Sequence, residues 1–308
     1  MTYDIQEIST LLAQDPAGSI KNWEQGYRRQ VAATAAYILD IREKSPVVLL
    51  AGPSGSSKTT TATRIRDHLI GLGIRAHLIS MDNYYLSRND PSFPTLADGS
   101  PDLESPECLD MALLEEHFSL LETGNDVYVP IYDFPSHERL AGRSIRMDAS
   151  TGDVFIFEGI HALNDRFTAH HPDACRVYVS PEDDFQKDGK LFCTPVLLRL
   201  MRRIVRDYQF RGATAQYSLE LWNNVVESEK RYIAPYKSTA NCCITTTLPY
   251  ELGVLRQFVA PLLQDLPKDI ARRNDVTAIQ KILSEVSPLS DALVPADSIL
   301  REFIGDRS

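Results

Sequence analysis

Short apolar runs alternate with longer amphipathic runs along most of this chain. The runs at 47–51 and 153–159 are too short for helices and too apolar for a surface, so they are predicted to form buried strands. Further strands are predicted at 74–80, 175–180 and 241–246. Helices are predicted between them, at 19–44, around Ile65 and Leu69, and at 109–121, 194–210 and 216–233. Such alternation is typical of an α/β fold in which a parallel sheet of about five strands is flanked by helices.

Two segments are more than simple connections between these elements. Residues 127–134 and 142–147 are predicted to pair as a small hairpin. Residues 83–106 are rich in Pro, Ser, Asp and Gly, and this segment is longer than a loop that only connects two elements of a compact domain. Long loops of this kind usually position functional groups. We therefore expect the hairpin and this loop to lie near a functional site.

Composition narrows the function classes. The chain has 308 residues, of which 43% are hydrophobic and 24% charged, and its formal net charge is −10. These values exclude disorder across the whole chain, and the acidic balance argues against a protein that grips nucleic acid through its phosphates. No apolar run approaches the roughly 20 residues that span a bilayer, and the N-terminus does not have the pattern of a signal peptide. We expect a cytoplasmic protein with no nucleic-acid or membrane partner, and a homo-oligomer stays open.

The sequence GPSGSSKT lies between a predicted strand and a predicted helix, which is the context of a P-loop. Small residues let successive backbone N–H groups surround a phosphate, and the helix N-terminus adds positive potential. Lys58 would contact the β- and γ-phosphates, and the Thr59 hydroxyl would face Mg²⁺. Ser57 stands where the usual pattern has Gly, which requires either an ordinary or a strained backbone there. The predicted nucleotide-binding residues of this loop are Gly52, Ser54, Gly55, Ser56, Ser57, Lys58, Thr59 and Thr60.

Two carboxylates follow predicted strands. Ligands of open α/β sheets bind beyond the carboxyl ends of the strands, so Asp82 and Glu158 are expected to converge on one crevice. Asp82 could accept the proton of an attacking hydroxyl, and Glu158 could hold Mg²⁺ directly or through water. The predicted metal-binding residues are Thr59, Glu158 and Asp82. No cysteine or histidine spacing indicates a zinc site.

The segment RRIVRDYQFRG concentrates arginine in a chain that is otherwise acidic. Guanidinium groups match the oxygens of polyphosphate, which favours a phosphate-binding role over a solvated helix face. Gly212 follows the segment and is predicted to act as the hinge of a flap. The arginines of this cluster are Arg202, Arg203, Arg206 and Arg211.

The chain resembles the uridine kinase and phosphoribulokinase family, and most of all its bacterial uridine kinase-like nucleoside kinases. The motifs GPSGSSKTT, MDNYY, YDFPSHER, FIFEGIHALN, RRIVRDYQFRG and APYKSTAN occur in the order seen in that family. The similarity extends from about residue 45 to the final SILREFIG. It implies a P-loop kinase fold with a hairpin and a lid, and an enzyme that uses ATP and Mg²⁺.

The resemblance also implies roles for single residues. Asp82 matches the catalytic base, with Lys58 and Arg206 as further catalytic groups. Arg206 and Arg211 resemble lid arginines that close over ATP. On the substrate side, the resemblance points to Tyr85, Glu104, Tyr132, His137 and Arg203. The family usually has Asp where Glu104 stands, and often Arg where Ala213 stands.

The acceptor is expected to be neutral. Between Asn83 and Glu104, acidic residues outnumber the single Arg88, so a pocket there should repel a phosphorylated sugar and suit a polyol. We therefore predict ATP- and Mg²⁺-dependent phosphorylation of a nucleoside 5′-hydroxyl, uridine or cytidine first. Two alternatives stay open: a kinase of another nucleoside, a sugar or a vitamin alcohol, and a nucleotide-binding regulator without phosphotransfer. The expected domains are an N-terminal helical segment (1–44), a P-loop kinase domain with the hairpin and lid (45–264) and a C-terminal helical extension packed on it (265–308).

Overall fold

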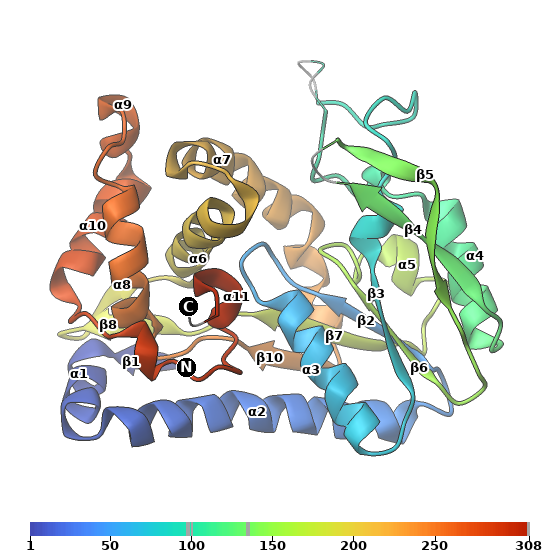
Figure 1. The fold of residues 1–308 in the computed structure, drawn as a ribbon, viewed down its shortest axis with the longest axis horizontal. Coiled ribbons are helices and arrows are strands. Elements are labelled where there is room, and N and C mark those ends of the chain that lie inside the picture. Colours follow the sequence, from blue (N-terminus) through green and yellow to red (C-terminus); the bar gives the residue numbers. More distant parts are fainter. Residues whose placement is uncertain (97–98, 100, 134–135, 307–308) are drawn as a thin grey trace.

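The centre of the molecule is a parallel five-stranded sheet (Figure 1). The computed structural model describes residues 1–96, 99, 101–133 and 136–306. The strands lie in the order β10-β7-β2-β6-β3, and every neighbouring pair is parallel. Their bounds are β2 Val47–Ala51, β3 Ala76–Ser80, β6 Val154–Glu158, β7 Cys175–Ser180 and β10 Cys242–Thr245. The prediction of a parallel sheet of about five strands is confirmed.

Both faces of the sheet are buried, which explains its continuous apolar strands. Along β2, Val48 and Leu50 belong to one core cluster, whereas Val47 and Leu49 belong to the other. The first cluster packs against α2 (Pro16–Ile41), α3 (Lys58–Gly71), α6 (Pro195–Arg211), α7 (Ala215–Tyr232), α8 (Glu251–Leu262) and α10 (Asn274–Glu285). The second cluster packs against α4 (Met111–Glu122) and α5 (Asp165–Thr168).

The predicted hairpin is present beside this core. It consists of β4 (Val127–Asp133) and β5 (Glu138–Met147), which pair antiparallel with an irregularity near Pro130. Figure 1 shows it at the side of the molecule that also holds α4 and α5. The hairpin is therefore placed near the end of the sheet at which β3 lies.

A second, three-stranded sheet was not predicted. It combines β1 (Thr2–Asp4), β8 (Asp184–Lys187) and β9 (Lys190–Cys193), with β8 in the middle. These strands are short, and β8 is the mostly polar sequence DFQK, so no apolar run marks them. The parallel pairing of β1 with β8 ties the N-terminal helices to the rest of the fold.

The remaining helices lie at the two ends of the chain. The predicted helix at 19–44 is α2, which begins and ends three residues earlier than predicted, and α1 (Ile5–Gln14) precedes it. Near the other end lie α9 (Lys268–Ala271), α10 and the short α11 (Arg301–Ile304). In Figure 1, α11 lies beside α6, which it contacts. None of the helices in the described ranges is long and apolar enough to span a bilayer.

Candidate active site

The loop between β2 and α3 has a shape that only small residues permit. Gly55 has a φ of +76°, and a Cβ there would lie 2.9 Å from the carbonyl oxygen of Arg199. A Cβ on Gly52 would lie 1.9 Å from the carbonyl oxygen of Val179. Both glycines are therefore required by close backbone approaches, in agreement with the predicted P-loop.

Ser57 adopts the strained alternative that the sequence left open. Its φ of 65° and ψ of 35° are left-handed, and the residue is the N-cap of α3. This conformation costs a non-glycine residue about 1–2 kcal/mol. The hydroxyl oxygens of Ser56 and Ser57 are also buried without a hydrogen-bond partner among the described residues. Buried hydroxyls left unsatisfied in a loop of this shape fit a phosphate ligand, because a phosphate supplies the missing acceptors.

The predicted catalytic and metal-binding side chains lie at the ends of adjacent strands. Glu158 ends β6, and it pairs in register with Ser80 at the end of β3. Asp82 follows in the 3-10 turn Met81–Tyr84. The Thr59 hydroxyl donates to Glu158 Oε1 at 3.1 Å, and Lys58 Nζ donates to the carbonyl oxygen of Pro53 at 3.2 Å.

Burial and charge shift the pKa values of these groups. Burial lowers the pKa of Lys58, although the charges of Glu158 and Asp82 oppose that change. Burial raises the pKa of Asp82, against the charges of Lys58 and Arg211. Burial and then the charge of Asp82 raise the pKa of Glu158 to about 7. Two carboxylates that disfavour each other's ionisation are therefore close to the lysine of the loop.

The donor set fits Mg²⁺ better than a transition metal. A hydroxyl and two carboxylates are oxygen ligands, which a hard cation prefers, and Mg²⁺ usually takes its other ligands from water and substrate phosphates. Within the described ranges, no group of three or more His, Cys, Asp or Glu residues could hold a metal. Thr59, Glu158 and Asp82 have oxygen atoms of the kind that Mg²⁺ prefers, and their role as its ligands stays a prediction.

Three of the predicted arginines surround one buried acid on α6. Asp207 lies 3.2 Å from Arg203 Nε, 2.8 Å from Arg206 Nη2 and 3.6 Å from Arg211 Nη1. Arg203 also donates to the Ser54 hydroxyl at 3.0 Å, which brings the cluster to the P-loop. Asp207 thus positions guanidinium groups beside the loop that the sequence assigns to phosphates.

Arg202 does not belong to this cluster, contrary to the prediction. Its side chain is fully buried and forms a bidentate ion pair with Glu251 at 2.7 and 2.9 Å. It also donates to the carbonyl oxygen of Gly55 at 3.2 Å and packs 5.1 Å from the ring centre of Phe303. A guanidinium with these partners holds the P-loop in place and has no free edge for a polyphosphate.

Several of the predicted substrate-side residues meet near Asp82. The rings of Tyr85 and Tyr132 are 5.5 Å apart. Burial raises the pKa of Tyr85, and the charges of Asp82 and Glu104 raise it further. Burial likewise raises the pKa of Glu104 to about 6, against the charges of Arg203 and Lys58. An aromatic and acidic surface therefore lies next to the proposed base.

A cavity of about 680 Å³ opens beside this surface, between the 88–104 loop and α7. Glu104, Arg203 and Tyr232 are among the residues that line it. Its volume is within the range of pockets that hold small molecules, roughly 300–1,000 Å³. An acceptor could therefore reach Glu104 and Arg203 from this cavity.

His137 is the predicted substrate residue that the structure does not join to the others. It lies in a turn with a φ of 58°, and its carbonyl oxygen accepts a hydrogen bond from Arg88 N at 3.0 Å. Phe134 and Pro135 of the same motif lie outside the described residues. Its role toward an acceptor base stays a prediction.

Comparison with known proteins identifies the family. The model of the phosphoribulokinase/uridine kinase family matches residues 47–250, which is more than half of the chain. This chain belongs to the phosphoribulokinase/uridine kinase family. Family membership makes it a phosphotransferase of the P-loop kinase type, a class that generally uses ATP and Mg²⁺.

Curated relatives agree with this assignment. The chain is 31% identical over 196 residues to a uridine kinase of Halobacterium salinarum, covering 63% of this chain and 77% of that protein. It is 31% identical over 202 residues to a uridine kinase of Macrococcus caseolyticus, covering 65% and 88%. A solved D-glycerate 3-kinase from Cryptococcus neoformans shares 17% identity with a TM-score of 0.37, covering 84% of this chain and 86% of that one.

Sequence analysis did not single out three residues that interact with the predicted site. His161, three positions after Glu158, is buried, and neither ring nitrogen has a well-formed hydrogen bond within the described ranges, although the Glu104 backbone is close. Asp207 lies inside the arginine motif, where its acid could have suggested the ion pairs. Glu302 of α11 accepts a hydrogen bond from the Thr60 hydroxyl, and only the fold brings them together.

Proposed function

We propose that this kinase transfers the γ-phosphoryl group of ATP to the 5′-hydroxyl of a nucleoside, with uridine or cytidine as the first candidate. The observation that supports this most is the position of Asp82. Its charge acts on Lys58 of the P-loop and on Tyr85 and Glu104 of the predicted acceptor side, so Asp82 is close to both groups. An acceptor hydroxyl bound near these groups would be close to Asp82, which could take its proton, and to the γ-phosphate of ATP bound at the P-loop.

In this proposal the side chains divide proton transfer, charge neutralisation and metal binding among them. Asp82 accepts the proton of the acceptor hydroxyl, and its raised pKa makes it a stronger base than an ordinary aspartate. Lys58 and Arg206 neutralise charge on the transferring group, which is the main contribution that a protein makes to phosphoryl transfer. Mg²⁺ at Thr59, Glu158 and Asp82 would add Lewis-acid neutralisation of the phosphate oxygens. The protein otherwise acts by positioning.

The acceptor side favours a neutral polyol with a ring. Glu104 can accept hydrogen bonds from sugar hydroxyls, and the paired rings of Tyr85 and Tyr132 offer a surface for a flat base. The acid of Glu104 would repel an acceptor that already has a phosphate. The uridine kinase names of the relatives support the same choice.

The decisive experiment measures ADP release with ATP, Mg²⁺ and a panel of acceptors. We expect the highest kcat/KM with uridine or cytidine and no turnover with a phosphorylated sugar. A higher kcat/KM with a free sugar or vitamin alcohol would favour the alternative kinase. Tight ATP binding with no product from any acceptor would instead make the chain a nucleotide-binding regulator.

Asp82→Asn tests the mechanism. The variant should lower kcat about 10²- to 10⁴-fold, the usual contribution of a general base, while the Kd for ATP stays nearly unchanged. Asp90→Asn is the matched control, because the Asp90 carboxylate lies in the following loop and, among the described residues, accepts hydrogen bonds from Ser92 of its own turn. Retained turnover in Asp82→Asn would remove Asp82 from the role of base.

A further inference from the structure

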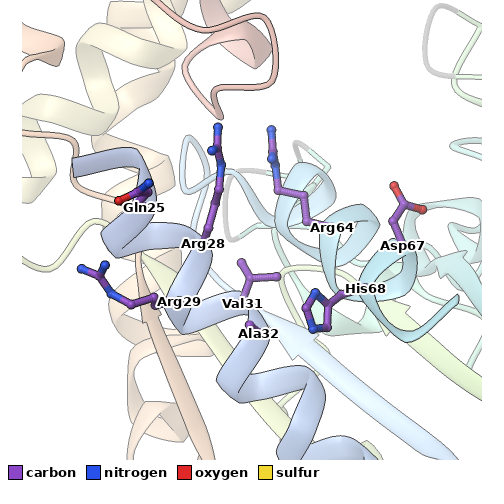
Figure 2. Close-up of a pocket in the computed structure, with 8 residues that line it drawn as sticks. All are labelled: Gln25, Arg28, Arg29, Val31, Ala32, Arg64, Asp67 and His68. Carbon is purple, nitrogen blue, oxygen red and sulfur yellow. The ribbon is translucent and has the colours of Figure 1, made fainter. Parts of the chain in front are cut away.

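A groove of about 620 Å³ lies between α2 and α3, separate from the acceptor cavity (Figure 2). Arg28 and Arg29 line it from α2, and Arg64 and His68 line it from α3. The family match begins at residue 47, so α2 lies outside the matched region. This basic groove therefore combines the nucleotide-binding helix of the family with a helix outside the matched region.

Arg64 is held in place before any ligand arrives. Its guanidinium lies 5.8 Å from the ring centre of Tyr27, a cation–π arrangement. The Tyr27 hydroxyl is hydrogen-bonded to the Thr61 hydroxyl at 3.0 Å, which fixes the ring against α3. The Nε of Arg64 is buried and has no hydrogen-bond partner in the part of the chain that the structure describes. In Figure 2, the side chains of Arg28 and Arg64 point to the same side of the groove.

The acids around the groove are already engaged. Asp67 pairs with Arg66 at 2.7 Å, and Asp297 pairs with Arg28 at 2.7 Å. Two further acids act on this region through their charge: Glu24, which accepts from Tyr250 at 2.6 Å, and Glu302, which accepts from Thr60.

Two of the groove's cations stay without such a partner. No acid of the described ranges lies within ion-pair distance of Arg64 or Arg29. Glu24 interacts with Arg64 through its charge but forms no ion pair with it, so the guanidinium hydrogens of Arg64 stay available to a ligand.

We propose that this groove binds the phosphate group of a small molecule. Guanidinium groups bind phosphate oxygens through charge-assisted and often bidentate hydrogen bonds, so Arg64 would supply the main contact. Arg28 would join it, because its side chain points to the same side of the groove and its exposed pair with Asp297 is weak. The apolar side chains of Val31 and Ala32 also line the groove and would contact an organic part of the ligand. The ligand class is therefore a phosphate monoester or an inorganic polyphosphate, bound apart from the site of phosphoryl transfer.

A ligand in this groove is coupled to the P-loop through one rigid element. Helix α3 begins at Lys58, and Arg64 lies less than two turns further along it. Thr61, which bonds to Tyr27, lies between them. Binding at Arg64 consequently acts on the same helix that presents Lys58 and Thr59, so it alters the affinity for nucleotide, and nucleotide alters affinity at the groove by the same factor.

Calorimetric titration of the ADP- and Mg²⁺-loaded protein tests the proposal, because ADP then occupies the P-loop. Inorganic phosphate, pyrophosphate and uridine monophosphate are titrated separately, which distinguishes a free phosphate from a phosphate ester. We expect at least one of them to bind, and Arg64→Gln to weaken that binding about tenfold, the loss of a charge-assisted contact. Lys21→Gln is the matched control on α2 and should leave the binding unchanged, because Lys21 is exposed and does not line the groove.

Two further measurements keep the outcome decisive. Turnover without added ligand should be the same in Arg64→Gln and in the unaltered protein, which shows that the substitution spares the transfer site. If Arg64→Gln reduces the yield of folded protein, Arg28→Glu provides the same test at an exposed position. The absence of binding in the unaltered protein would overturn the proposal. So would binding in Arg64→Gln and Arg28→Glu that is as tight as in the unaltered protein. A negative result in the nucleoside kinase assay would contradict the proposed function but not the proposed phosphate site in this groove.

Discussion

Glu302 of the C-terminal helix α11 accepts a hydrogen bond from the Thr60 hydroxyl in the first turn of the P-loop helix. A carboxylate therefore stands beside the end of α3 that is predicted to receive phosphate. Its negative charge also acts on Lys58, which it helps to keep protonated. The C-terminal extension consequently contributes a charge to the nucleotide side of the site, in addition to packing against α6.

Glu302→Gln should tighten ATP binding. The substitution removes a negative charge near bound phosphates, and a partly screened pair of charges at this range contributes roughly 1 kcal/mol, equivalent to a Kd lowered about fivefold. Equilibrium titration with a nonhydrolysable ATP analogue measures the effect. Asp297→Asn is the control, because that acid pairs with Arg28 on α2. An unchanged or weaker affinity in Glu302→Gln would show that the carboxylate does not oppose the nucleotide.

Ser57→Gly should raise thermal stability. Glycine adopts the left-handed conformation of this position without the strain that serine bears, a gain of about 1 kcal/mol. The change also removes a buried hydroxyl that has no partner in the described ranges. For a chain of this size, thermal unfolding should shift upward by roughly 2–4 °C. Ser57→Ala keeps the strain, so it should give no comparable rise, and a lower midpoint for Ser57→Gly would contradict the argument.

Asp207→Asn should weaken both the fold and nucleotide binding. The substitution leaves Arg203, Arg206 and Arg211 without their shared counter-ion, and removing a buried acid from such a network costs about 2–4 kcal/mol. We expect a lower denaturation midpoint together with a higher KM for ATP, since the arginines lose their fixed positions. Glu227→Gln serves for comparison, because its pair with Lys230 is largely exposed. Equal effects of the two substitutions would refute a positioning role for Asp207.

His161 should make the fold sensitive to acid. Burial lowers the pKa of His161 to about 4, below its usual 6.5. Between these two pH values the imidazole is protonated in the unfolded chain but neutral in the folded chain. Stability is therefore complete above pH 6.5 and is lost as the pH falls toward 4, by roughly 3 kcal/mol in total. Denaturant titrations at several pH values should show this loss shrinking in His161→Leu. His170→Asn, an exposed histidine, should keep the full pH dependence. A loss of equal size in His161→Leu would point to other groups.

The strands of the central sheet could be predicted because burial on both faces makes them continuously apolar. The predicted ranges 47–51 and 175–180 coincide with β2 and β7. By contrast, β8 is short and mostly polar, so its pairing with β1 depends on contacts that no local pattern shows. The limits of sequence-based prediction therefore lie in long-range pairing.

The same limit applies within the site. Arg202 and Arg203 are adjacent and identical in type, yet one is fully buried against Glu251 and the other reaches the Ser54 hydroxyl. Their difference arises from the direction that each side chain takes from α6, which residue type alone does not specify. The sequence also left two backbone conformations open at Ser57, and the fold selects the strained one.

The P-loop is contiguous in sequence, but its shape depends on distant segments. Gly52 lies against the carbonyl of Val179, Gly55 against that of Arg199, and the Thr246 hydroxyl donates to the carbonyl oxygen of Ser56. A peptide of residues 45–72 would therefore contain every residue of the motif but would lack the distant segments whose contacts determine the shape of the loop. Nucleotide affinity in this protein is consequently a reporter of tertiary structure, and it should vanish together with the global unfolding transition.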